Sequence, residues 1–148
     1  MSDLITSDDP LTPAERKTLK AVQDTLVPAS DDGRMPSAGE LDAGAWIAEK
    51  DPGFLASTRT FLAALDDGFA ALDYEARHEA LAQLSGMMPD VFNQLLMHVY
   101  AIYYQDDSTL IGLGLRGGPL FPSGHTVEAG DLSLLDPVIA GRHRYRDA

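Results

Sequence analysis

The chain has 148 residues and no cysteine, and 11 lysines and arginines stand against 23 aspartates and glutamates, giving a net charge of −12. This length suits one ordinary domain with its own core, and the absence of cysteine excludes disulfides, thiolate metal sites and a cysteine nucleophile. The negative charge disfavours nucleic acid and anionic membrane surfaces as partners. No apolar run approaches the ~18 residues of a membrane span, so we expect no direct membrane insertion.

Capping residues define the first predicted helix. Residues 1–10 are polar and carry no helical pattern, so we expect a flexible arm there. Thr12 is suited to the N-cap, Pro13 to the first helical position and Glu15 to the return contact of a capping box. Apolar residues then recur at helical spacing until Pro28. The sequence therefore predicts a helix that begins at residue 13 and ends before residue 28.

Four more helices are predicted before residue 106. Ser37 and Glu40 form a second capping box, which opens a short helix. Residues 54–72 show the most regular apolar spacing of the chain, at steps of three and four. Asp73 is suited to cap a fourth helix. Pro89 begins a fifth helix, whose apolar face is the broadest of the chain, and we expect this helix to be central.

We expect one structural domain of the all-α class, in which about five helices of residues 11–105 form a compact bundle. After Gln105 glycine and proline become frequent, and no helical pattern persists. Long segments without regular structure are unusual inside a compact domain, and the apolar residues of this segment argue against disorder. Residues 106–148 are therefore predicted to form an irregular, partner-binding arm with a basic tail. Cutting the chain after Gln105 is expected to leave a soluble helical domain that no longer binds.

Residues 112–117 match the glycine pattern G-x-G-x-x-G of dinucleotide-binding loops. In those proteins the loop follows a strand and leads into a helix whose N-terminus binds pyrophosphate. Here the pattern follows a predicted helix, and Pro119 and Pro122 disfavour a helix directly after it. We therefore expect no cofactor on this chain.

A second motif, Pro-Ser-Gly-His-Thr at residues 122–126, matches the central motif of acid phosphatases that use a histidine nucleophile. Those enzymes also need a lysine and an arginine upstream to bind phosphate, and a His-Asp pair downstream. The lysines of this chain, Lys17, Lys20 and Lys50, lie far upstream among acidic residues, and no such pair follows. We interpret the motif as a turn. A small hydrolase that loses its activity in His125→Ala is kept as a third hypothesis.

The four histidines do not have the spacing of a metal site. His78, His98, His125 and His143 form no pair three or four residues apart on a helix. No catalytic triad can be argued either, because order along the sequence does not fix geometry. We therefore expect no metal site and no enzyme activity of this chain on its own.

Tyrosines and arginines of the C-terminal part can contact another chain. The tyrosines at the end of the fifth helix fit either core packing or a partner interface, and the arginines of the tail fit either carboxylate recognition or a solvated end. The residues predicted to bind a partner are Tyr103, Tyr104, Leu113, Arg116, Leu120, Phe121, Pro122, His125, Arg142, Arg144, Tyr145 and Arg146.

Several stretches of the chain follow one another in the order of a known family. They are Leu11–Leu19, Leu26–Pro28, Ala38–Gly39, residues 54–72, Tyr74–Arg77 before Leu81 and Leu84, Phe92–Asp107, Leu113–Gly114 and Gly117–Pro119 with Pro122 and Gly124. In this order the chain resembles the small (third, or gamma) subunit of gluconate 2-dehydrogenase and related flavoprotein dehydrogenases. No single motif carries the resemblance, which covers roughly residues 10–146.

The resemblance implies an all-helical, chaperone-like accessory subunit without catalytic residues. Its partner would be a larger FAD-dependent oxidoreductase of the glucose-methanol-choline type, with FAD bound on that partner. Family members often carry a twin-arginine export signal. This sequence begins without one, a departure that leads us to expect a cytoplasmic complex. The alternative function is a self-contained helical adaptor or regulator without a flavoprotein partner.

Overall fold

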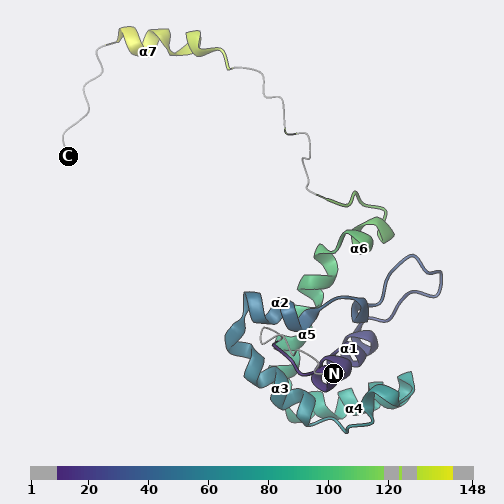
Figure 1. Cartoon of the computed structure of the whole chain (residues 1–148). Helices are drawn as coiled ribbons and strands as arrows, with labels where there is room; N and C mark the ends of the chain where they lie inside the picture. The colour runs from purple at the N-terminus through teal and green to yellow at the C-terminus, as the bar shows by residue number, and fades with distance from the viewer. Residues whose placement is uncertain (1–9, 119–123, 125–129, 142–148) are drawn as a thin grey trace, which may run out of the picture. The chain divides into compact units, whose positions relative to one another are not determined.

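The computed structural model describes residues 10–118, 124 and 130–141, and all secondary structure in these residues is helical. The chain divides into two units, residues 1–118 and 119–148 (Figure 1). The predicted all-α class is confirmed for the described residues, but seven α-helices occur there instead of about five. The helices are α1 (Pro13–Leu26), η1 (Ala38–Glu40), α2 (Ala43–Lys50), η2 (Pro52–Phe54), α3 (Leu55–Ala63), η3 (Phe69–Ala71), α4 (Tyr74–Met87), α5 (Pro89–Gln105), α6 (Asp107–Gly112), η4 (Leu132–Leu135) and α7 (Asp136–Ala140), where η marks a 3-10 helix.

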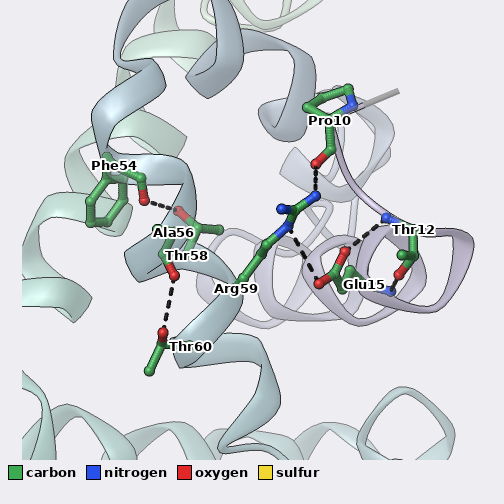
Figure 2. Close-up of polar contacts among 8 residues, drawn as sticks. All are labelled: Pro10, Thr12, Glu15, Phe54, Ala56, Thr58, Arg59 and Thr60. Atoms are coloured by element: carbon green, nitrogen blue, oxygen red, sulfur yellow. Dashed lines mark hydrogen bonds and ion pairs between the residues drawn. The ribbon is translucent and has the colours of Figure 1, made fainter. Parts of the chain in front are cut away.

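The start of α1 is fixed by its own cap and by a side chain of α3. The Thr12 hydroxyl accepts a hydrogen bond from the Glu15 amide at 3.2 Å, and the Glu15 carboxylate accepts one from the Thr12 amide at 2.8 Å. This confirms the predicted capping box. Arg59 of α3 donates to the carbonyl oxygen of Pro10 at 2.5 Å and pairs with Glu15 at 3.6 Å (Figure 2). Arg59 therefore joins α3 to the beginning of α1.

The second predicted helix begins later than its capping box indicates. Ser37 accepts a hydrogen bond from the Gly39 amide at 3.0 Å, but it caps only the 3-10 helix η1. The α-helix α2 begins at Ala43, where Asp42 accepts from the Ala45 amide at 2.9 Å. Serine and aspartate are equally good N-caps, so the sequence alone did not distinguish the two positions.

The long helix predicted over residues 54–72 is interrupted. Between α3 and η3 the chain turns, and the Phe69 amide donates to the carbonyl oxygen of Asp66 at 2.8 Å. Two aspartates and a glycine form this turn, and these residue types favour turns over helix interiors. Leu65 and Phe69 are both buried. The apolar spacing therefore identified core residues correctly, although the backbone between them is not one helix.

The segment predicted to be irregular after Gln105 contains helices. Asp106 accepts hydrogen bonds from the amides of Ser108 at 3.0 Å and Thr109 at 3.4 Å, and it thereby caps α6. A helix of 6 residues is too short to show a helical period in the sequence. The first unit also extends to residue 118, so residues 106–118 belong with the helices and not with the arm.

The core of the first unit is formed in two clusters. Helices α1 and α5 each contact α2, α3 and α4. The smaller cluster, of Ala38, Val99 and Tyr103, joins η1 to the second half of α5. The larger cluster takes fully buried side chains from α1, α2, α3 and α5, among them Val22, Ile47, Phe61 and Leu95.

A buried glutamine holds η1 against α1. Gln23 donates from Nε2 to the carbonyl oxygens of Ala38 at 2.7 Å and Leu41 at 3.1 Å, and only 2% of its surface is exposed. A buried amide needs such partners, so this side chain positions the segment after α1. A Cβ atom on Gly39 would lie 3.0 Å from the Lys20 carbonyl oxygen, so glycine permits the close approach of η1 to α1.

Candidate partner-binding surface

One face of α5 is apolar and exposed. Met97, Tyr100 and Tyr104 are three and four residues apart, so they lie on one side of the helix. Met97 is 66% exposed and Tyr104 is 54% exposed, whereas Leu95 and Val99 on the other side are fully buried. The rings of Tyr100 and Tyr104 have centres 6.1 Å apart. Helix α5 therefore presents one apolar face to the core and a second one to solvent.

Further exposed apolar side chains lie in α6 and in the turn that follows it. The turn is well defined, because the Leu115 amide donates to the Leu110 carbonyl oxygen at 2.8 Å and the Gly118 amide donates to the Asp107 carboxylate at 2.7 Å. Helix α6 contacts α5. We call the exposed apolar side chains of α5, α6 and the turn after α6 the α5–α6 apolar surface. Its members are Met97, Tyr100, Tyr104, Ile111, Leu113 and Leu115.

Tyr103, which the sequence placed among the partner-binding residues, belongs to the core. It is 2% exposed, and its hydroxyl donates to the carbonyl oxygen of Pro36 at 2.9 Å. Burial raises the pKa of the Tyr103 phenol above its ordinary value. Successive residues of an α-helix are rotated by about 100°, so Tyr103 shares the buried side with Val99 while Tyr104 faces solvent.

Three other predicted partner-binding residues lie at the surface of the first unit. Tyr104, Leu113 and Arg116 are exposed. Tyr104 lies in α5, and Leu113 and Arg116 lie in the turn after α6. The remaining predicted residues lie outside the described part of the chain: Leu120, Phe121, Pro122, His125, Arg142, Arg144, Tyr145 and Arg146.

The described residues 130–141 of the second unit form a short helical segment. Asp131 accepts hydrogen bonds from the Ser133 hydroxyl at 2.6 Å and the Ser133 amide at 3.0 Å, which lower the pKa of Asp131 and cap η4. Helix α7 follows directly, and neither helix contains a buried residue. Isolated helices this short are marginal in water, so covering their apolar side chains would stabilise them. Those side chains are Leu132, Leu134, Leu135, Val138 and Ile139.

The glycine pattern at residues 112–117 has a structural explanation. A Cβ atom on Gly112 would collide with the carbonyl oxygen of Arg34 and would lie 2.8 Å from the sulfur of Met35. Gly114 has a φ of 79°, which glycine adopts more easily than other residues. Within the described residues the pattern follows helix α6 and not a strand. These glycines therefore serve close packing and a turn.

The two histidines of the described residues take part in ring packing. The His98 ring stacks on Phe54 with centres 5.4 Å apart, and its Nε2 lies 3.2 Å from a carboxylate oxygen of Asp51. The His78 ring stacks on Tyr74 with centres 6.1 Å apart. Across the residues described, no three side chains of metal-binding type come together. None of the described helices is long and apolar enough to cross a bilayer.

Sequence reasoning did not identify Met97, Ile111 and Leu115 as surface residues. A signal for Met97 was present, because α5 carries apolar residues around most of its circumference. Only one stripe of a helix at the surface of a domain can face the core. Apolar residues of α5 outside that stripe must therefore contact solvent or another chain. Ile111 and Leu115 lacked such a signal, because α6 is too short to show a pattern.

Comparisons of the chain with protein-family models, with curated proteins and with solved structures find no match.

Proposed function

We propose that this chain is a non-catalytic small subunit that binds and stabilises a larger FAD-dependent dehydrogenase or oxidase acting on alcohols or sugars. The observation that carries the binding role is the α5–α6 apolar surface, together with the uncovered side chains of η4 and α7. The class of partner follows from the sequence resemblance. In this proposal the partner holds FAD, and the present chain supplies an apolar surface.

The free energy expected from covering the exposed apolar side chains indicates that a stable complex needs both the α5–α6 apolar surface and the η4–α7 segment. Full burial of a large apolar side chain contributes about 1.5–3 kcal/mol. The six members of the α5–α6 apolar surface are on average about half exposed, so covering each contributes about 1 kcal/mol, or about 6 kcal/mol in all. Association costs about 4–15 kcal/mol in lost freedom of motion. The α5–α6 apolar surface alone therefore supports a weak complex at best, and a stable one also needs η4 and α7.

The acidic character of the chain indicates the charge of the partner. Asp106 lies between α5 and α6, Asp107 is the first residue of α6, and the whole chain has a net charge of −12. Complementary charge speeds association and excludes wrong partners. We therefore expect a partner surface that is apolar at its centre and basic at its rim, and an association rate that falls as salt is added.

Two exposed methionines provide a matched test. Met97 lies on the α5–α6 apolar surface, and Met87 is 72% exposed at the end of α4, outside it. A glutamate in place of Met97 puts a charge inside the proposed interface and should weaken binding of the flavoprotein at least about tenfold. Met87→Glu makes the same chemical change elsewhere and should leave binding unchanged. Equal binding by both variants would contradict the proposal.

A self-contained helical adaptor or regulator is the second candidate function. The first unit favours it, because its helices enclose a core without help from another chain. Hydrogen exchange separates the two candidates. A stable, colourless monomer with residues 106–146 protected would support the adaptor. A flavoprotein subunit is expected to show protection of residues 131–140 only in the complex.

A further inference from the structure

A pocket of about 380 Å³ lies between α1, η1, η3 and α4, within the first unit. One face of α1 forms its floor, with Lys17, Lys20 and Asp24 three and four residues apart. Its other walls come from Ser37, Gly39 and Glu40 near η1, Ala70 of η3 and Arg77 of α4. Ligand pockets commonly have volumes of about 300–1,000 Å³, so the pocket can hold a small molecule.

The walls of the pocket are fixed by hydrogen bonds. Asp24 accepts from the Ser37 hydroxyl at 2.6 Å and from Nη2 of Arg77 at 3.2 Å. These two contacts tie η1 and α4 to the same residue of α1. Gly39 completes the arrangement, because a Cβ atom there would lie 3.1 Å from the Asp24 Cβ atom. The pocket is therefore formed by folding of the first unit and does not depend on a ligand.

Two lysines that pair with no acidic group of the described residues line this pocket. The chain has only three lysines, and Lys17 and Lys20 both line it. Neither forms an ion pair with a described residue. Asp24 is already occupied by Arg77, so Glu40 is the one acidic wall residue left to oppose two ammonium groups. In a chain with a net charge of −12, this pocket has a local excess of positive charge.

Arg77 adds an unused hydrogen-bond donor. The Arg77 side chain is 15% exposed, and it donates to Asp24 through Nη2 alone. In a two-bond contact with a carboxylate or phosphate, Nε and Nη2 of an arginine donate together. Nε is buried and has no hydrogen-bond partner among the described residues. A buried donor without an acceptor is unfavourable, and an oxygen atom of a ligand bound beside Arg77 could supply the missing acceptor.

We propose that this pocket binds a small oxyanion with more than one negative charge, a phosphate or a polycarboxylate, between the ammonium groups of Lys17 and Lys20 and the guanidinium group of Arg77. The ammonium groups bind the outer oxygens of the ligand, and Arg77, held by Asp24, provides a fixed positive charge. This site is separate from the α5–α6 apolar surface, so it does not rest on the proposed flavoprotein partner.

Titration of the full chain with inorganic phosphate, and separately with citrate, tests this site. Amide chemical shifts are followed at neutral pH and constant ionic strength, with sodium chloride as the balancing salt. Saturable shifts are expected at Gly39 and Ala70 with at least one of the two anions. Saturation by phosphate alone identifies a phosphate site, and saturation by citrate alone identifies a carboxylate site. Linear, unsaturated shifts with both anions would overturn the proposal.

Substitutions of exposed charges assign the binding to this pocket. Lys17→Gln and Lys20→Gln should each weaken binding about threefold to fivefold, the usual effect of removing one partly exposed charge pair. Lys50→Gln is the matched control, because Lys50 pairs with Glu49 away from the pocket, and it should leave binding unchanged. Glu40→Gln should tighten binding about threefold, because it removes the opposing charge. An equal loss in Lys50→Gln, or no gain in Glu40→Gln, would contradict the assignment.

Discussion

Gly112 offers a sharp test of the packing between α6 and the loop before η1. Helix α6 ends at Gly112, where the chain passes so close to Arg34 that a Cβ atom would collide with the Arg34 carbonyl oxygen. Arg34 also donates from Nη2 to the Gly112 carbonyl oxygen at 3.3 Å. Alanine at this position should therefore push α6 away from the loop and destabilise the first unit.

The expected magnitude follows from two opposing effects. Overpacking costs about 1–3 kcal/mol, and here a backbone carbonyl has to move as well as the flexible Met35 side chain. Replacing glycine by alanine in a helix returns at most about 0.5–1 kcal/mol, and less at a terminal residue. The net loss for Gly112→Ala is about 1–2 kcal/mol by these values.

Gly86 provides the matched control for this substitution. It lies in α4, and apart from its chain neighbours and the backbone of its own helix no atom comes within 4 Å of a Cβ atom built on it. Gly86 lies in the last turn of α4, so Gly86→Ala should stabilise the protein slightly, by at most about 0.5 kcal/mol. Urea denaturation followed by circular dichroism measures the free energy of unfolding of both variants. Equal stability of Gly112→Ala and Gly86→Ala, or a gain in Gly112→Ala, would refute the close approach at Gly112.

Three further predictions test the core and the boundary of the first unit. Gln23→Leu removes two hydrogen bonds and should lower the free energy of unfolding by about 2 kcal/mol. The control Gln83→Leu, at an exposed position of α4, should change the free energy of unfolding by less than about 0.5 kcal/mol. The raised pKa of Tyr103 means that the folded state favours the neutral phenol, so its contribution to stability is fully present below pH ~10 and is lost as the pH rises further. Tyr103→Phe should lessen this alkaline loss, as measured by thermal denaturation. An unchanged pH profile in the variant would contradict this prediction. A fragment ending at Gly118 should unfold cooperatively, whereas one ending at Gln105 lacks α6 and should be less stable; equal thermal midpoints would place α6 outside the first unit.

Local capping signals predicted the positions of several helices well. Thr12 with Glu15, Asp73 and Pro89 each lie at the start of an α-helix as expected. Thr12, Glu15 and Asp73 form hydrogen bonds with backbone amides within three positions of themselves, and Pro89 favours the first helical position through its fixed φ. Their effect is therefore readable from a short stretch of sequence, whatever the rest of the chain does.

Errors arose where tertiary contacts decide between local alternatives. Ser37 has a good capping pattern, yet its hydroxyl also donates to Asp24 of α1, and the α-helix begins only at Ala43. Tyr103 and Tyr104 are adjacent residues that face different sides of α5, and only Tyr103 reaches the carbonyl oxygen of Pro36 and is buried. Contacts between residues so far apart in the chain leave no periodic signal in the sequence.

The α5–α6 apolar surface was predictable only in part. The sequence placed apolar residues and tyrosines at the end of α5 and beyond it, but it could not separate those of the core from those facing solvent. The pocket lined by Lys17, Lys20 and Arg77 was not predicted at all. Lys20 of α1 and Arg77 of α4 are far apart in sequence, and their meeting depends on how η1 and η3 fold against α1.

Isolation of the tagged chain from native lysate under mild conditions tests the proposed function most directly. The visible spectrum and the masses of the co-purifying proteins are the two quantities to record. A yellow complex with one large flavoprotein, lost in Met97→Glu and kept in Met87→Glu, is the expected result. A colourless chain recovered alone in good yield would contradict the accessory-subunit role and favour the self-contained adaptor.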